Sequence, residues 1–292
     1  MKTLQAYNPA VAFFYLIICA LLPVFSVNPV ILCVSLFLSV SFYLLTVKNG
    51  SRHFHLFSAA VFAAVTVVNP IFSHNGRPVL FVMNDNPVTL EALLYGAAMG
   101  AALVSAIYWF AAFSKIMTSD KIMYIFARVS PKAALLISMT LRFIPMFKKT
   151  AQQTSDAQKA TGLYNDTDSA ANLKSRLQVY SSVVTRALET GIVTADSMEA
   201  RGYSSGKRTG FAIYRFDMRD GIFSAVALLL FIFFVLGSAF SNSEFIYYPD
   251  ISQIPHDAFS LVCYISYFIM AALPSALELG DIFKWKFLIS KI

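Results

Sequence analysis

The stretch A-D-S-M-E-A-R-G-Y at residues 195–203 closes a long polar segment in an otherwise membrane-like chain. Counted back from it, apolar or small residues recur in steps of three and four, which is the spacing of one face of a helix. These residues are Leu173, Leu177, Tyr180, Val184, Leu188, Ile192, Ala195 and Met198. Gly202 follows the last of them, where a left-handed helix cap is usually a glycine. The pattern predicts a long amphipathic helix with Arg201 on its last turn.

Arg201 at the end of this helix has two interpretations. A cation near a helix C-terminus is favoured by the helix macrodipole, and spacing alone favours this simple capping role. The alternative is a contact with another protein, because a guanidinium offers five donors in a rigid fork to a carboxylate or to carbonyl groups. The residues by themselves leave both interpretations open.

The composition indicates an integral membrane protein. Hydrophobic residues make up 57% of the 292 residues and charged residues only 13%, whereas an ordinary soluble domain has roughly 25% charged residues. The three cysteines lie inside apolar runs, with no disulfide framework or zinc-ligand spacing. They are Cys19, Cys33 and Cys263. We therefore expect no metal site and no cofactor.

The positive charge is concentrated in one part of the chain. Residues 114–220 contain 16 of the 23 Lys and Arg but only 9 of the 16 Asp and Glu, so the net charge of +7 belongs to this segment. Positively charged connections between spans stay on the cytoplasmic side of a membrane. The basic residues are interleaved with acids and accompany no aromatic platform, which argues against nucleic acid as a partner.

Hydropathy predicts six membrane spans, since each needs about 20 apolar residues. The expected spans cover residues 9–26, 29–46, 56–72, 90–113, 221–240 and 259–277. The predicted fold class is an all-α integral membrane protein with a cytoplasmic platform of long amphipathic helices. The predicted parts are the N-terminal spans in 1–113, a coupling-helix region in 114–220, and the C-terminal spans in 221–292. Both chain ends are predicted to be cytoplasmic, and the connections at 74–86 and 241–257 external.

Two shorter segments carry further predictions. Residues 133–147 are too short and too charged for a clean span, so we expect a helix at the membrane surface or dipping into the membrane, bent near Pro145. Within the fourth span, Gly96 and Gly100 form a small-xxx-small pattern that permits another helix to approach closely. That pattern fits packing within the chain as well as contact with a partner.

The spans lack the groups that transport or catalysis in the membrane would use. Ion-coupled carriers place acidic residues, basic residues or broken helices at mid-membrane. No Asp, Glu, Lys, Arg or His lies near the middle of a predicted span. The chain has no H-E-x-x-H, no G-x-x-x-x-G-K-[ST] and no G-x-S-x-G motif. We expect a non-catalytic protein whose polar platform couples it mechanically to another protein.

Several motifs in the polar segment resemble a known family. Besides the stretch at 195–203, they are L-R-F-I-P at 141–145, D-A-Q-K-A-T-G at 156–162 and the tail at 208–217. In this order they resemble the transmembrane T component of energy-coupling factor (ECF) transporters, the EcfT/CbiQ-like family. The likeness covers residues 115–220 firmly and the spans loosely.

The resemblance implies a scaffold subunit in a bacterial plasma membrane. Such a subunit sits on two cytoplasmic ABC ATPases and holds a separate substrate-binding S component for the uptake of a micronutrient, such as a vitamin or a metal ion. Two Ala-Arg-Gly motifs at helix ends dock on the ATPases. The transported substrate is not readable here, because in the family the S component selects it.

The resemblance also assigns candidate docking residues. They are Ala200, Arg201 and Gly202 with the adjacent Glu199, and Ala160, Thr161 and Gly162 with the nearby Lys159. The first motif of the two departs from the family pattern, because Thr161 stands where arginine is usual. We therefore expect two chemically different docking points, as two non-identical ATPases would require. Gly96 and Gly100 are candidates for contact with the S component or for helix packing.

Two other classes of protein remain as alternatives. A conventional ABC importer permease also docks on ATPases, but through an E-A-A-x-x-x-G loop that this sequence lacks. It would bind its solute within its own spans. A membrane enzyme is the third possibility, disfavoured by the absence of paired acids, metal ligands or a nucleophile with its base.

Overall fold

The computed structural model describes the chain in ten segments. These are residues 4–47, 50–72, 79–83, 86–162, 169–203, 214, 216–240, 245–248, 251–255 and 257–289, without side chains for 79–83, 86–88 and 169–171. Most of the tail at 208–217 lies outside the described residues. So do parts of the connections predicted to be external.

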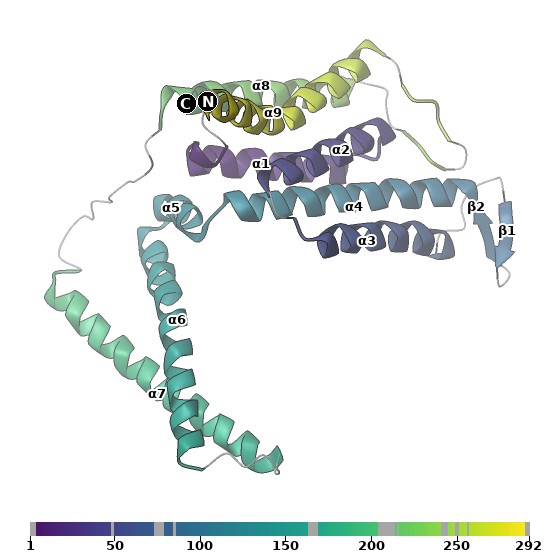
Figure 1. Cartoon of the computed structure of the whole chain (residues 1–292). Coiled ribbons are helices and arrows are strands. Elements are labelled where there is room, and N and C mark those ends of the chain that lie inside the picture. Colours follow the sequence, from purple (N-terminus) through teal and green to yellow (C-terminus); the bar gives the residue numbers. More distant parts are fainter. Residues whose placement is uncertain are drawn as a thin grey trace. The chain divides into compact units, whose positions relative to one another are not determined.

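The described residues are almost entirely helical (Figure 1). The elements are η1 (Leu4–Ala6), α1 (Pro9–Phe25), α2 (Pro29–Thr46), α3 (Arg52–Phe72), β1 (Val79–Met83), β2 (Asn86–Thr89), α4 (Leu90–Ile116), α5 (Ser119–Val129), α6 (Pro131–Ala160), α7 (Ser169–Ala200), α8 (Met218–Phe240) and α9 (Ala258–Ile289). They fall into two compact units, one formed by residues 1–122 with 214–292 and the other by residues 123–213. Each unit is described below by itself.

The first unit contains the six apolar helices that hydropathy predicts. Five of them, α2, α3, α4, α8 and α9, are long and apolar enough to cross a membrane. The sixth, α1, has 17 residues, which is the lower limit for a span. The predicted class of an all-α membrane protein is confirmed. Several helices extend beyond their predicted spans, and the largest extensions are in α3, which begins at Arg52, and in α9, which continues to Ile289.

A short hairpin was not predicted. Strands β1 and β2 pair antiparallel in the connection between α3 and α4, with Met83 opposite Asn86. The run V-L-F-V-M at 79–83 is rich in β-branched and other apolar residues, which is a strand signal. Because this run has only five residues and lies in a connection with many polar residues, the sequence did not indicate a strand there.

Asparagine and threonine side chains fix the starts of three membrane helices. The Oδ1 atoms of Asn8 and Asn28 accept hydrogen bonds from the amides of Ala10 and Val30, each at 3.1 Å. Thr89 Oγ1 accepts one from Ala92 N at 3.3 Å. Proline follows Asn8 and Asn28 at the first helical position, where a missing N–H costs nothing. The Asn-Pro pairs therefore start helices.

Close packing joins the membrane helices. The core of this unit centres on large side chains that are fully buried between α1, α2, α4 and α9, among them Leu16, Phe42, Trp109 and Tyr267. In α3 and α8 only 11% and 17% of the apolar window is buried. Such helices present most of their apolar side chains outward, as lipid-facing helices do.

Gly96 and Gly100 lie against α3, within the chain. A Cβ atom at Gly96 would come within 3.0 Å of both Asn69 Cβ and Thr66 O, and one at Gly100 within 3.1 Å of Phe62 Cδ2. Both glycines are buried. The small residues thus let α4 approach α3 closely, which is the packing role among the two that the sequence left open.

Two buried polar side chains, Lys121 and Asp220, form hydrogen bonds near the two points where the chain passes between the units. Lys121 Nζ donates to the carbonyls of Gln5 at 2.7 Å and Ile116 at 3.1 Å, and burial lowers the pKa of Lys121 below its ordinary value. Asp220 Oδ1 accepts from Asn8 N at 3.1 Å, and its Oδ2 from Asp217 N at 2.9 Å. These bonds tie the start of the chain to α4 and α8.

The packing of Gly96 predicts the effect of enlarging it. Replacing Gly96 by leucine should lower the free energy of unfolding by about 1–3 kcal/mol, because the new side chain overfills a closed contact. Thermal unfolding in detergent measures this. Gly191→Leu is the matched control, since no atom lies within 4 Å of a Cβ placed at Gly191. Equal stability of both variants would contradict the close contact between α3 and α4.

Candidate docking site at two helix ends

The second unit is built on two long helices that pack on each other. Helix α6 has 30 residues and α7 has 32, so each is about 45–50 Å long at 1.5 Å per residue. Residues 133–147 are part of α6, which continues through Pro145 to Ala160 as one helix. Only the hydrogen bond to the carbonyl of Leu141 is lost there, because proline has no N–H. That 133–147 enters the membrane stays a prediction.

The end of α7 is closed by two backbone hydrogen bonds. Gly202 has φ of 77°, so the predicted left-handed glycine cap is confirmed. Gly202 N donates to Glu199 O at 2.9 Å, and Tyr203 N to Met198 O at 3.0 Å. This pair of bonds is the Schellman motif, in which glycine is preferred because it lacks a Cβ. The last turn of α7 is therefore rigidly terminated.

The end of α6 has the same local geometry. Gly162 has φ of 74°, and Gly162 N donates to Lys159 O at 3.0 Å. Ala160 and Ala200 are the last helical residues, and Thr161 and Arg201 follow them in equivalent positions. We call residues 160–162 the α6 end and residues 200–202 the α7 end. The two sequence motifs thus share a glycine of positive φ and its hydrogen bond to the carbonyl three residues earlier.

The side chains at the two ends differ. Thr161 Oγ1 lies 3.2 Å from Ala157 O and 3.0 Å from Gln158 O, so its hydroxyl bonds back to its own helix. Arg201 is exposed, and within the described residues its guanidinium forms no hydrogen bond or ion pair. The carbonyls of the last turn of α7 are occupied by the amides of Gly202 and Tyr203. Arg201 is accordingly available to a partner, while Thr161 is not a cation and is already bonded.

The two charged candidates next to these ends, Lys159 and Glu199, are both exposed. Lys159 Nζ lies 3.8 Å from Asp156 Oδ1, and both side chains are largely exposed. Exposed pairs of this kind stabilise a fold by at most about 1 kcal/mol. Glu199 is exposed one turn before Tyr203. Neither residue explains the shape of its helix end, which depends on the backbone alone.

The apolar face predicted for α7 is present, but its side chains are exposed. Six of its side chains are between 37% and 69% exposed. They are Leu173, Leu177, Tyr180, Val184, Leu188 and Ile192. The residues that α7 buries are instead Ser175 and Val179. Periodicity identified the helix but not the face that packs on α6.

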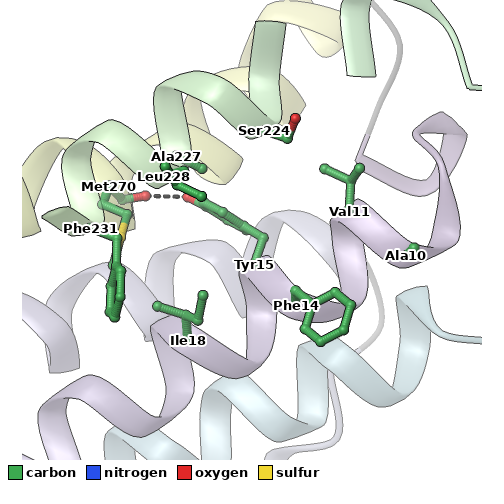
Figure 2. A pocket seen from close by; sticks show the side chains of 10 residues that line it. All are labelled: Ala10, Val11, Phe14, Tyr15, Ile18, Ser224, Ala227, Leu228, Phe231 and Met270. Carbon is green, nitrogen blue, oxygen red and sulfur yellow. Dashed lines mark hydrogen bonds between the residues drawn. The ribbon is translucent and has the colours of Figure 1, made fainter. Parts of the chain in front are cut away.

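One cavity of the first unit lies between α1, α8 and α9. It has a volume of about 320 Å³. Figure 2 shows its lining, in which apolar side chains surround Tyr15 and Ser224, and Tyr15 OH donates to the carbonyl of Met270. No charged side chain is among its lining residues. The described residues also contain no group of three or more His, Cys, Asp or Glu that could hold a metal ion.

These features define a class of protein. It is a multi-pass helical membrane protein with a second unit in which two long helices, α6 and α7, each end at a glycine of positive φ. The profile of the CbiQ family, described as cobalt transport protein, matches residues 2–210. The chain belongs to this family, which confirms the resemblance read from its motifs. It is therefore a membrane component of a transport system.

Part of the chain is also similar to a curated relative. It is the energy-coupling factor transporter transmembrane protein EcfT 1 of Listeria monocytogenes serotype 1/2a (strain 08-5578), 32% identical over 99 residues. The alignment covers 33% of this chain and 37% of the relative. The chain thus spans little more than a third of the relative's length in this match.

The α7 end predicts a local cost for removing its glycine. Gly202→Ala forces an alanine into the left-handed region, which costs roughly 1–2 kcal/mol. The hydrogen bonds of residues 202 and 203 should open more often, so hydrogen exchange measured by mass spectrometry should accelerate in the peptide containing them. Gly191→Ala, in the exposed middle of the same helix, should leave that exchange unchanged. Equal protection in both variants would contradict the cap.

Proposed function

We propose that this chain is the T component of an ECF-type ABC importer, a non-catalytic scaffold between two ATPases and a membrane S component. The observation that carries the proposal is that α6 and α7 both end in a glycine of positive φ whose amide donates to the carbonyl three residues earlier. Its support from outside the structure is the CbiQ family match together with the name of the Listeria relative. In this proposal each end docks in a groove of one ATPase.

The chemistry of the α7 end suits such a contact. Arg201 extends from a rigid helix end, so little conformational entropy is lost when its fork meets a carboxylate or a row of carbonyls. Gly202 then turns the chain away and leaves room for the partner. Helix macrodipole stabilisation of an exposed Arg201 is worth only about 0.3–1 kcal/mol. A buried charged contact is worth more, which favours docking over simple capping.

The exposed apolar face of α7 is the second contact surface in this proposal. Soluble proteins rarely leave a continuous apolar stripe uncovered, and the six exposed side chains from Leu173 to Ile192 form one. We assign this stripe to the S component or to the membrane surface beneath it. Closing of the ATPases would shift the two helix ends, and the packed pair of α6 and α7 would pass that movement to the S component.

The membrane arrangement follows from charge. The unit that carries α6 and α7 contains most of the basic residues, so it belongs on the cytoplasmic side of the bacterial plasma membrane. An even number of spans then places both chain ends in the cytoplasm. The cargo is a micronutrient, either a vitamin or a metal ion such as cobalt or nickel, selected by the S component.

Arg201 provides the test. Arg201→Ala and Arg201→Glu should weaken ATPase binding by about 30-fold or more, because losing one partner of a buried charged contact costs about 2–5 kcal/mol. The readout is the amount of each ATPase recovered with the tagged chain from native membranes in mild detergent. Arg186→Ala and Arg186→Glu, exposed in the middle of α7, are the matched controls. Unchanged recovery with the Arg201 variants would overturn the docking role.

A further inference from the structure

A basic groove lies between α6 and α7, separate from the two helix ends. It has a volume of about 600 Å³. Its polar lining consists of Lys148, Gln152, Ser155, Asp156 and Lys159 from α6 and Arg176 from α7. The α6 residues recur at steps of four, three, one and three, so they form one face of the helix. Together these residues are the basic groove.

The lining of the groove carries more positive than negative charge. Three cations and one acid line it, and the acid, Asp156, lies 3.8 Å from Lys159. Lys148 and Arg176 are exposed and form no ion pair among the residues that the structure describes. Like charges brought together from two helices repel each other, and a bound anion would relieve that repulsion. Arg176 can grip a carboxylate with two parallel hydrogen bonds.

The position of the groove points to its occupant. Lys159 is two residues from Thr161, so the groove runs along α6 directly up to the α6 end. At that end Thr161 is uncharged and bonded to its own helix, unlike Arg201 at the α7 end. A partner that docks on the α6 end therefore meets its nearest cations in the groove instead of at the helix end.

We infer that the basic groove binds an acidic segment of the ATPase that docks on the α6 end, so that the two ends recognise their ATPases by different contacts. This inference rests on the proposed function. Lys148 and Arg176 form the two sides of the site, and Gln152 and Ser155 supply further hydrogen-bond donors. The α7 end uses Arg201, and the α6 end uses the groove.

Charge reversal tests the inference with a close control for each variant. Lys148→Glu and Arg176→Glu place acids in the groove. Lys149→Glu and Arg186→Glu make the same changes at exposed positions that do not line it. All four substitutions are on exposed side chains, and thermal unfolding of each purified variant verifies that it folds. The readout is the number and identity of ATPase subunits per tagged chain, measured by quantitative mass spectrometry of the complex from native membranes.

The inference predicts that each groove variant loses one of the two ATPases at least tenfold and retains the other. Arg201→Glu should show the reverse loss, and the two control variants should retain both. Retention of both ATPases by the groove variants would overturn the inference and leave the proposed function standing. If those variants also bound vesicles of phosphatidylglycerol more weakly, the groove would belong to lipid headgroups. Absence of any ATPase from the wild-type complex would overturn the proposed function and the inference with it.

Discussion

The hydrogen bonds from Gly202 and Tyr203 to the last carbonyls of α7 are the interaction on which the docking account depends. They satisfy two carbonyl groups that a helix end otherwise leaves without partners. Since the backbone closes the helix, the guanidinium of Arg201 is not needed to do so. The same backbone shape at Gly162 gives α6 an equivalent end. The side chains at the two ends differ, and we propose that this difference lets the ends recognise two distinct partners.

The membrane unit is consistent with a scaffold that binds no solute of its own. Its helices pack through small residues and apolar side chains, and the polar bonds of Lys121 and Asp220 lie where the chain leaves for the other unit. The described cavity between α1, α8 and α9 is apolar and has no charged lining.

Sequence reasoning succeeded where one local signal decides the structure. Span length and apolarity identified the membrane helices, a period of 3.6 residues identified α7, and a glycine after the last periodic residue identified the cap of α7. It failed where contacts between elements decide. The hairpin of β1 and β2 and the burial of Ser175 instead of the apolar stripe both depend on packing. The basic groove was missed for the same reason, because Lys148 and Arg176 are far apart in the sequence and no periodicity relates them.

The central claim is that this chain joins two ATPases to one membrane partner. Native mass spectrometry of the complex purified from its own membranes tests the claim most directly, because it counts subunits and identifies each. The account predicts one copy of this chain with two ABC ATPase subunits and one small, very hydrophobic membrane protein. Recovery of the chain alone, or with a periplasmic or lipid-anchored solute-binding protein, would contradict it.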